Sequence, residues 1–254
     1  MQAEFDKLLA CQTSDTSRAR LLAVSAKHSS NWLHALPISN CGLRLDDEAI
    51  RVAVGFRFGT VLCSPHKCVC GDPVDSYGSH SLSCKKSNIR ILRHNALNDI
   101  ICRALVKASV PAVKEPPGLS RSDGKRPDGV TQIPWALGKC LTWDVTVTDT
   151  LASSYVALSS TSAGNAAEGA ATNKEAKYVN LRDSYDFVPI AFETLGSING
   201  AGVAFLSSLG RRLITSSGDP RESSFLFQRL SVCLQRFNSL ALGNTFRDKP
   251  ADYQ

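Results

Sequence analysis

The sequence predicts a mixed α/β domain in which helices flank a central sheet, with the order α-β-β-β-α-β and then two further helices. Three segments predict this fold class. Apolar side chains recur at helical spacing over residues 88–108, alternate strictly with polar ones over residues 141–148, and return to helical spacing over residues 163–181. The chain has 254 residues, 43% of them hydrophobic and 20% charged, which is enough for a substantial core.

Residues 1–60 are predicted to form a helical accessory region. Asp15 or Ser17 could cap a first helix, and Asp46 could begin a second one. Pro37 separates the two pieces. No cluster of catalytic residue types occurs in this region.

Residues 61–86 are rich in turn residues and are predicted to form a zinc knuckle. Its candidate ligands follow the pattern C-x-C-x9-H-x3-C and are Cys68, Cys70, His80 and Cys84. Thiolate and imidazole ligands suit tetrahedral zinc, and such a small segment needs a metal to fold. Only one residue separates the first two cysteines, so Cys63 or His66 could replace one of the four. A site with four protein ligands would be structural or nucleic-acid-binding.

Residues 87–245 are predicted to form the main domain, and residues 246–254 a tail. The first helix of this domain, over residues 88–108, is expected to bury one apolar stripe. The stripe consists of Ile89, Leu92, Ala96, Ile100, Ala104 and Ala108.

The centre of the predicted sheet is the strand over residues 141–148. Its alternation places Trp143 and Val145 on a buried face and Asp144 on an open face. The other expected elements are strands over residues 112–115, 126–134 and 187–194 and helices over residues 163–181, 199–215 and 220–241.

Positive charge is concentrated in one part of the chain. Between Lys85 and Arg126 there are ten Lys or Arg residues and three acidic ones, a net +7 in a chain whose total is +6. This predicts a polyanionic partner, DNA first and RNA as an alternative, although a solvated surface would look the same. The residues expected to bind nucleic acid are Lys85, Lys86, Arg90, Arg93, Arg121, Lys125 and Arg126.

Two aspartates on neighbouring strands could converge on one Mg²⁺ ion. Asp128 lies in an Arg-Pro-Asp-Gly sequence, and fifteen residues separate it from Asp144. Each could instead be an ordinary turn or surface acid. Lys174 falls on the alanine stripe of the helix over residues 163–181, where it could reach the aspartates or extend to solvent at the stripe edge, and Lys177 is the second choice.

These motifs together resemble the restriction-like endonuclease region that follows reverse transcriptase in site-specific non-LTR retrotransposons. The resemblance spans residues 20–243, and the Asp-Gly-Lys-Arg-Pro-Asp-Gly run with its distance to Trp-Asp is its most specific part. The matching segments are the cysteine-histidine pattern and residues 93–99, 123–129, 143–146, 174–178 and 192–196.

The resemblance implies a PD-(D/E)xK nuclease fold in which Asp128 is the first acid and Asp144 the second. Thr146 stands where that family usually has its lysine, which places the lysine on the following helix, at Lys174 or Lys177. Apart from the resemblance, Glu115, which precedes two prolines, is a further candidate acid of the site or an ordinary loop acid. The implied activity is that of a Mg²⁺-dependent endodeoxyribonuclease that nicks or cleaves target DNA for retrotransposon insertion.

Two other functions are compatible with the sequence. The chain could be a catalytically inactive nucleic-acid-binding remnant, or a zinc-stabilised interaction domain unrelated to DNA. No Tyr-x-Asp-Asp signature of reverse transcriptase occurs, so the resemblance implies a piece of a larger element protein or a decayed copy. The first residues do not have the pattern of a secretory signal, and no apolar run is long enough for a membrane span. We therefore expect an intracellular, nuclear protein.

Overall fold

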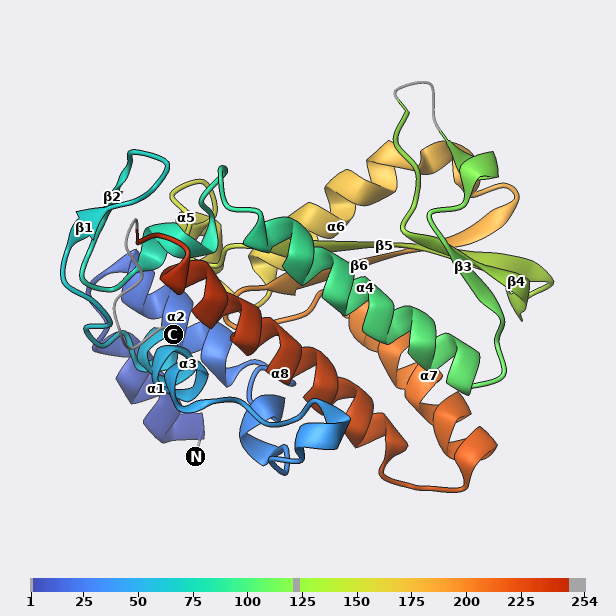
Figure 1. Ribbon diagram of the computed structural model, residues 1–254, viewed down its shortest axis with the longest axis horizontal. Coiled ribbons are helices and arrows are strands. Elements are labelled where there is room, and N and C mark those ends of the chain that lie inside the picture. The colour runs from blue at the N-terminus through green and yellow to red at the C-terminus, as the bar shows by residue number, and fades with distance from the viewer. Residues whose placement is uncertain (1, 121–123, 247–254) are drawn as a thin grey trace.

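The centre of the fold is a four-stranded mixed sheet in the order β3-β4-β5-β6 (Figure 1). The computed structural model describes residues 2–120 and 124–246. Strands β3, β4 and β5 pair in antiparallel fashion, and β6 is parallel to β5. The strands are β3 (Ala112–Lys114), β4 (Gly129–Ala136), β5 (Lys139–Thr148) and β6 (Tyr185–Glu193).

The described part of the chain contains eight α-helices and five short 3₁₀ helices. The α-helices are α1 (Gln2–Ala10), α2 (Asp15–Ser25), α3 (Asp47–Phe58), α4 (Ile89–Lys107), α5 (Val156–Ser159), α6 (Asn165–Lys177), α7 (Gly200–Ser217) and α8 (Glu222–Gly243). The 3₁₀ helices are η1 (Asn31–His34), η2 (Ser39–Cys41), η3 (Ser79–Leu82), η4 (Pro117–Leu119) and η5 (Val179–Leu181). The predicted mixed α/β class is confirmed, and α5 is an additional turn of helix before α6. Within the described ranges, no helix combines the length and the apolar character that a membrane crossing needs.

Helices cover both faces of the sheet (Figure 1). The side chains of Leu141, Trp143 and Val145 point from β5 into the main core, which α4, α7 and α8 complete. On the other face, α6 packs through Ala167, Ala170 and Ala171 against Ala191 of β6. Small side chains allow the backbone of this helix to lie close to the strands.

The alternation predicted for β5 is confirmed, but its polar face is not open. Asp144 is only 3% exposed, because α6 lies across the face that carries it. A central strand with a parallel neighbour is normally covered on both faces. The expectation of an open face is therefore wrong, and the consequence is a buried carboxylate.

The buried face of α4 is shifted from the predicted stripe. Leu92 is 47% exposed, whereas Leu97, Ile101 and Leu105 are fully buried. The reason is that polar residues share the buried face. Arg93 is 2% exposed and donates a hydrogen bond to Asn238 Oδ1 (2.9 Å) on α8. A helical stripe drawn from apolar residues alone therefore misplaces the buried face of α4.

The N-terminal helices pack against α8 and against the loop after β6. Trp32 and Ala53 contact Val232 of α8, and Ala23 lies in a second small core with Leu195. Asp46 caps α3 as expected, accepting from the amide of Ala49 (2.7 Å). The cap of α2 is Ser14, however, and neither Asp15 nor Ser17, because the Ser14 hydroxyl accepts from the Ser17 amide.

Candidate functional site

The predicted cysteine-histidine cluster forms in the structure. The ligand atoms of Cys68, Cys70, His80 and Cys84 all lie within 4.8 Å of one another. Cys68 and Cys70 follow the hairpin strand β1 (His66–Lys67), which pairs with β2 (Pro73–Val74), and His80 lies on η3. This group could therefore hold a metal ion such as zinc.

The spacing of the ligand atoms fits a tetrahedral ion. Cys68 Sγ and Cys84 Sγ are 3.8 Å apart, and Cys70 Sγ and His80 Nε2 are 3.2 Å apart. Two sulfurs bound to one tetrahedral zinc at about 2.3 Å lie about 3.8 Å from each other. The Cys-x-Cys spacing works because the chain turns tightly after it, where Gly71 has a φ of +104° and donates to the Cys68 carbonyl.

The two alternative ligands have other partners. His66 bonds through Nε2 to the Thr245 hydroxyl (2.8 Å) and stacks on Phe246. Cys63 Sγ donates to the carbonyl of Asp75 (3.4 Å). Neither belongs to the cluster. Four protein ligands would saturate a tetrahedral ion, which fits the expectation of a structural or nucleic-acid-binding site.

A separate pocket contains the two aspartates. The β4–β5 register pairs Gly129 with Trp143, and a regular continuation by one residue would place Asp128 opposite Asp144. The Asp128 amide donates instead to the Trp143 carbonyl (2.9 Å), one residue out of this register, so the pairing is irregular at this point. Gly129 is required here, because a Cβ would lie 2.1 Å from Cζ2 of Trp143. The two carboxyl groups are neighbours nonetheless, because both residues line one cavity and the charge of Asp128 raises the pKa of Asp144.

Asp128 is held from two sides. The backbone amide of Val145 donates to its Oδ2 (2.5 Å), and His94 Nε2 lies 2.9 Å from the same oxygen. Burial lowers the pKa of His94, but the hydrogen bond and charge of Asp128 outweigh it and raise the pKa above its usual value. Sequence reasoning did not assign His94 to the site, because the shifted stripe of α4 left the direction of its side chain undefined.

Asp144 is the buried member of the pair. Lys174 Nζ, from α6, lies 2.5 Å from its Oδ1. Burial raises the pKa of the Asp144 carboxyl, the Asp128 charge raises it further, and Lys174 and the Tyr178 hydroxyl oppose the shift. Lys174 therefore reaches the second aspartate from the alanine-rich face of its helix, as the sequence suggested. Its side chain remains 26% exposed, so the pair is open to the pocket on one side.

All five residues proposed from the sequence for catalysis line one cavity of about 380 Å³ together with His94: Glu115, Asp128, Asp144, Lys174 and Lys177. Glu115 pairs with Arg126, which also lines the cavity. Lys177 Nζ donates to the Tyr178 hydroxyl (3.0 Å), which itself donates to the Arg126 carbonyl. Unlike the cysteine-histidine cluster, these acids do not bring three donor atoms within 4.8 Å of one another in the described part of the chain.

Positively charged residues surround this cavity. Lys85 and Arg90 line an adjoining pocket of about 420 Å³ that shares His94 and Lys174 with it. Of the other residues expected at a nucleic-acid surface, Lys86, Lys125 and Arg126 are exposed, and Arg121 lies outside the described residues.

Arg93 is a correction to that set. Its guanidinium is buried and donates to Asn238 and to the Leu82 carbonyl, so it supports packing, although the residue also lines the adjoining pocket. It was included because it lies in the basic segment, and charge alone does not distinguish a buried arginine from an exposed one.

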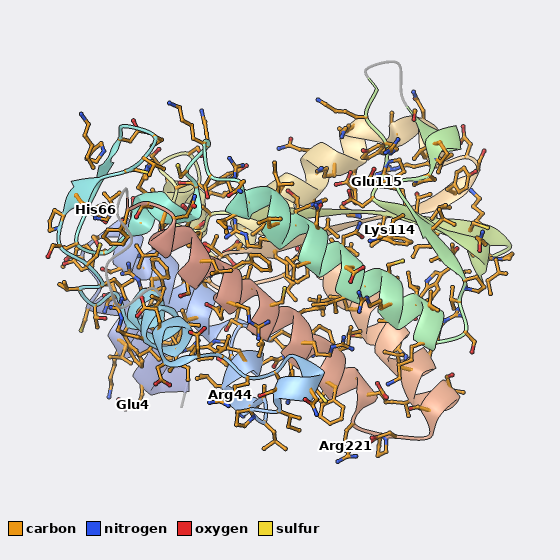
Figure 2. The ribbon with its side chains drawn as sticks, in the orientation of Figure 1. Glu4, Arg44, His66, Lys114, Glu115 and Arg221 are labelled. Carbon is orange, nitrogen blue, oxygen red and sulfur yellow. The ribbon has the colours of Figure 1, made fainter. Side chains whose placement is uncertain are left out.

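The cysteine-histidine cluster and the aspartate pocket lie toward different ends of the molecule. Figure 2 shows His66, beside the cluster, at one end of the long axis and Glu115, at the pocket, toward the other.

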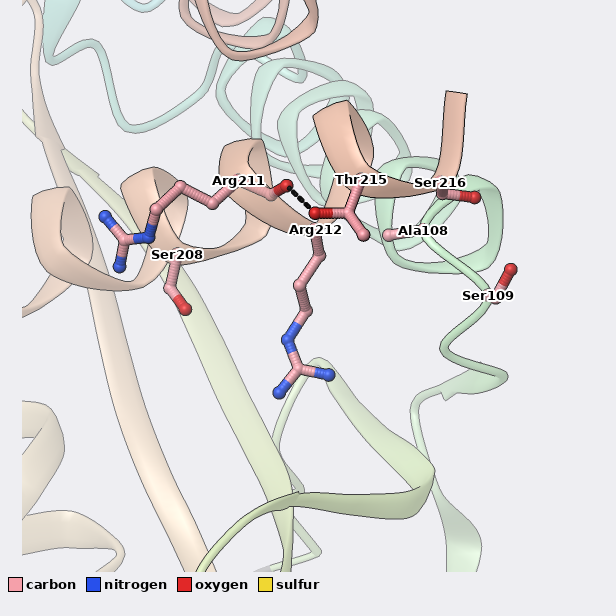
Figure 3. A pocket seen from close by; sticks show the side chains of 7 residues that line it. All are labelled: Ala108, Ser109, Ser208, Arg211, Arg212, Thr215 and Ser216. Carbon is pink, nitrogen blue, oxygen red and sulfur yellow. Dashed lines mark hydrogen bonds between the residues drawn. The ribbon is translucent and has the colours of Figure 1, made fainter. Parts of the chain in front are cut away.

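A third cavity of about 410 Å³ is lined by Arg211, Arg212 and hydroxyl side chains at the end of α4 and along α7 (Figure 3). The Arg212 guanidinium stacks on Trp135 at 4.0 Å. No motif in the sequence predicted this cavity.

Comparison of the sequence with models of known families and with curated proteins gives no match. The chemistry of the pocket is therefore inferred from its own residues.

Proposed function

We propose that this chain is a metal-dependent endonuclease that cleaves DNA at the Asp128–Asp144 pocket. The observation that carries the proposal is the neighbouring pair of aspartates with Lys174 on the second acid, in a cavity open to solvent and bordered by basic residues. A buried carboxylate with a lysine partner in a cleft is a typical catalytic arrangement. The α-β-β-β-α-β order and these positions support assignment to the restriction-like PD-(D/E)xK nucleases.

Asp128 and Asp144 would hold the catalytic cation, for which Mg²⁺ is the first expectation. The donor set fits, because Mg²⁺ is usually bound by one or two carboxylates together with water and substrate phosphate. When bound, the ion would activate water and neutralise charge on the phosphate. The burial of Asp144 favours a positive partner at this position, since an isolated charge in the interior is costly.

Lys174 would orient the attacking water and stabilise the charge that develops on the phosphate. Its ammonium group already lies at Asp144 Oδ1, and its partial exposure lets it face a substrate in the cavity. Thr146, the residue two positions after Asp144, lines the neighbouring pocket with Lys174. A lysine supplied by α6 would therefore replace one supplied by the strand.

Lys85 and Arg90 would contact the DNA backbone beside the cleavage site. They line the adjoining pocket, in which no acidic side chain is present among the described residues. The cysteine-histidine cluster precedes α4 directly and would fix the start of the helix that carries Arg90 and His94. Nicking of target DNA during retrotransposon insertion, in the nucleus, is the biological role that these features and the resemblance support.

A plasmid-nicking assay tests the proposal. The zinc-loaded chain should convert supercoiled DNA to nicked circles only when a divalent cation is added, and Asp128→Asn and Asp144→Asn should each lower the rate at least a hundredfold. Asp219→Asn is a matched control, because Asp219 pairs with Arg221 between α7 and α8, away from the pocket. Cleavage that persists in the double variant overturns the proposal. Salt-sensitive binding without cleavage by the unmodified chain would instead identify an inactive binding module.

A further inference from the structure

The His94 imidazole is placed between two oxygen atoms. Its Nδ1 lies 3.1 Å from Asn95 Oδ1, and its Nε2 lies 2.9 Å from Asp128 Oδ2. Both oxygens are acceptors: the protonated ring could donate to both, whereas the neutral imidazole has only one N–H to donate. With that proton on Nδ1, facing Asn95, the lone pair of Nε2 points at a carboxylate oxygen. A positive ion between Nε2 and Oδ2 would satisfy both atoms.

The spacing of these two atoms is that of neighbouring ligands on one ion. Two donors at right angles, each about 2.1 Å from an octahedral cation, lie about 3 Å apart. The observed 2.9 Å matches this value. The oxygen is also fixed in position by the Val145 amide. In metal sites, the second nitrogen of a histidine ligand normally donates to an oxygen, as Nδ1 can here toward Asn95.

The position of His94 allows access for an ion and for substrate. Its side chain is 31% exposed and that of Asp128 is 14% exposed. His94 lines both the aspartate cavity and the adjoining basic pocket, so an ion held there would lie where the two meet. The His94 side chain projects from the second turn of α4, and the helix fixes the backbone that carries it.

We propose that His94 is a direct ligand of the catalytic cation, together with Asp128, and that the site consequently prefers Mn²⁺ to Mg²⁺. Mg²⁺ selects oxygen donors, whereas first-row transition ions accept imidazole beside carboxylate and water. Two close protein donors leave coordination positions for water and phosphate, and Asp144 lines the same cavity. The inference rests on the proposed function for the role of the ion, but the binding of the ion can be measured without DNA.

Electron paramagnetic resonance on the full, zinc-loaded chain tests this ligand directly. Zinc fills the thiolate cluster first, and Mn²⁺ has little affinity for it. Wild-type protein should bind Mn²⁺ at least tenfold more tightly than Mg²⁺, and the spin echo of bound Mn²⁺ should carry the nitrogen modulation of a coordinated imidazole. His94→Gln should weaken Mn²⁺ binding at least tenfold and remove the modulation. His94→Glu, which supplies oxygen at similar reach, should reduce the preference for Mn²⁺ over Mg²⁺.

His34→Gln is the matched control, because His34 lies on η1 beside α8 and should leave both signals unchanged. Wild-type Mn²⁺ without nitrogen modulation, or unchanged Mn²⁺ affinity in folded His94→Gln, overturns the inference. The wild-type echo decides the question even if a variant fails to fold. Because no DNA is present, either negative result leaves the nicking test of Asp128 and Asp144 independent.

Discussion

Replacing Lys174 with methionine would leave the buried Asp144 carboxylate without its ammonium partner. Breaking a buried ion pair by removing one member costs about 3–5 kcal/mol. The lower end applies here, since Lys174 is 26% exposed and water can partly replace it. We expect a loss of about 3 kcal/mol in the free energy of unfolding near neutral pH, which lowers the urea midpoint by about 1 M. Lys177→Met, one helical turn further, should cost less than about 1 kcal/mol.

This loss should depend on pH in a defined direction. Burial and Asp128 already raise the pKa of Asp144, and removal of Lys174 raises it further. A carboxyl group whose pKa is raised in the folded state binds its proton more tightly there, so the folded state loses stability as pH rises through that pKa. The difference between Lys174→Met and wild type should therefore be full at about pH 8 and smaller at about pH 5.5.

Urea unfolding at both pH values, followed by circular dichroism with zinc present, measures the effect. Asp144→Asn combined with Lys174→Met removes the unpaired charge and should recover most of the lost stability. The stability difference between this double variant and wild type should no longer depend on pH in this way. An equal loss at both pH values, or no recovery in the double variant, would refute the role of the ion pair.

Three further predictions follow from the geometry. Gly129→Ala should destabilise the fold by about 1–3 kcal/mol in thermal or urea unfolding, because the new methyl group meets the Trp143 ring, and an unchanged midpoint would contradict the close contact. Chelation of zinc, or Cys84→Ser, should lower the melting temperature by about 10 °C or more, and chelation should add nothing to the variant. Lys85→Ala with Arg90→Ala should weaken DNA binding and reduce its salt slope by about 2 without changing stability, and an unchanged slope would exclude phosphate contacts there.

The element order could be predicted from the sequence because its signals are local. Strict alternation identified β5, and alanines at helical spacing identified α6. What covers each face is a non-local property. The alternation in the sequence predicted that Asp144 and Trp143 lie on opposite faces of β5. Only the packing of α6 shows that the polar face is covered. The carboxyl group is buried as a result, and its pKa is raised.

The error on α4 had a different origin. The predicted stripe counted apolar residues, but α4 also buries Arg93 and Asn98. Both have partners far away in the sequence: Arg93 bonds to Asn238, and Asn98 accepts from the Trp143 indole (2.8 Å). A polar side chain is stable in the interior when such partners exist, and no local pattern reveals them. The same shift hid His94, which lies next to Arg93 and faces Asp128.

The position of Lys174 depends on which face of the sheet α6 covers, and not on the distance in sequence between Lys174 and Asp144. Asp144 and Thr146 alternate with buried apolar residues and therefore lie on the same face of β5. A lysine at position 146 would reach the carboxylate from along the strand. Because α6 lies across this same face on its alanines, a lysine one turn beyond them reaches Asp144 equally well from above. Acid and ammonium therefore meet although the two residues lie thirty positions apart in the chain.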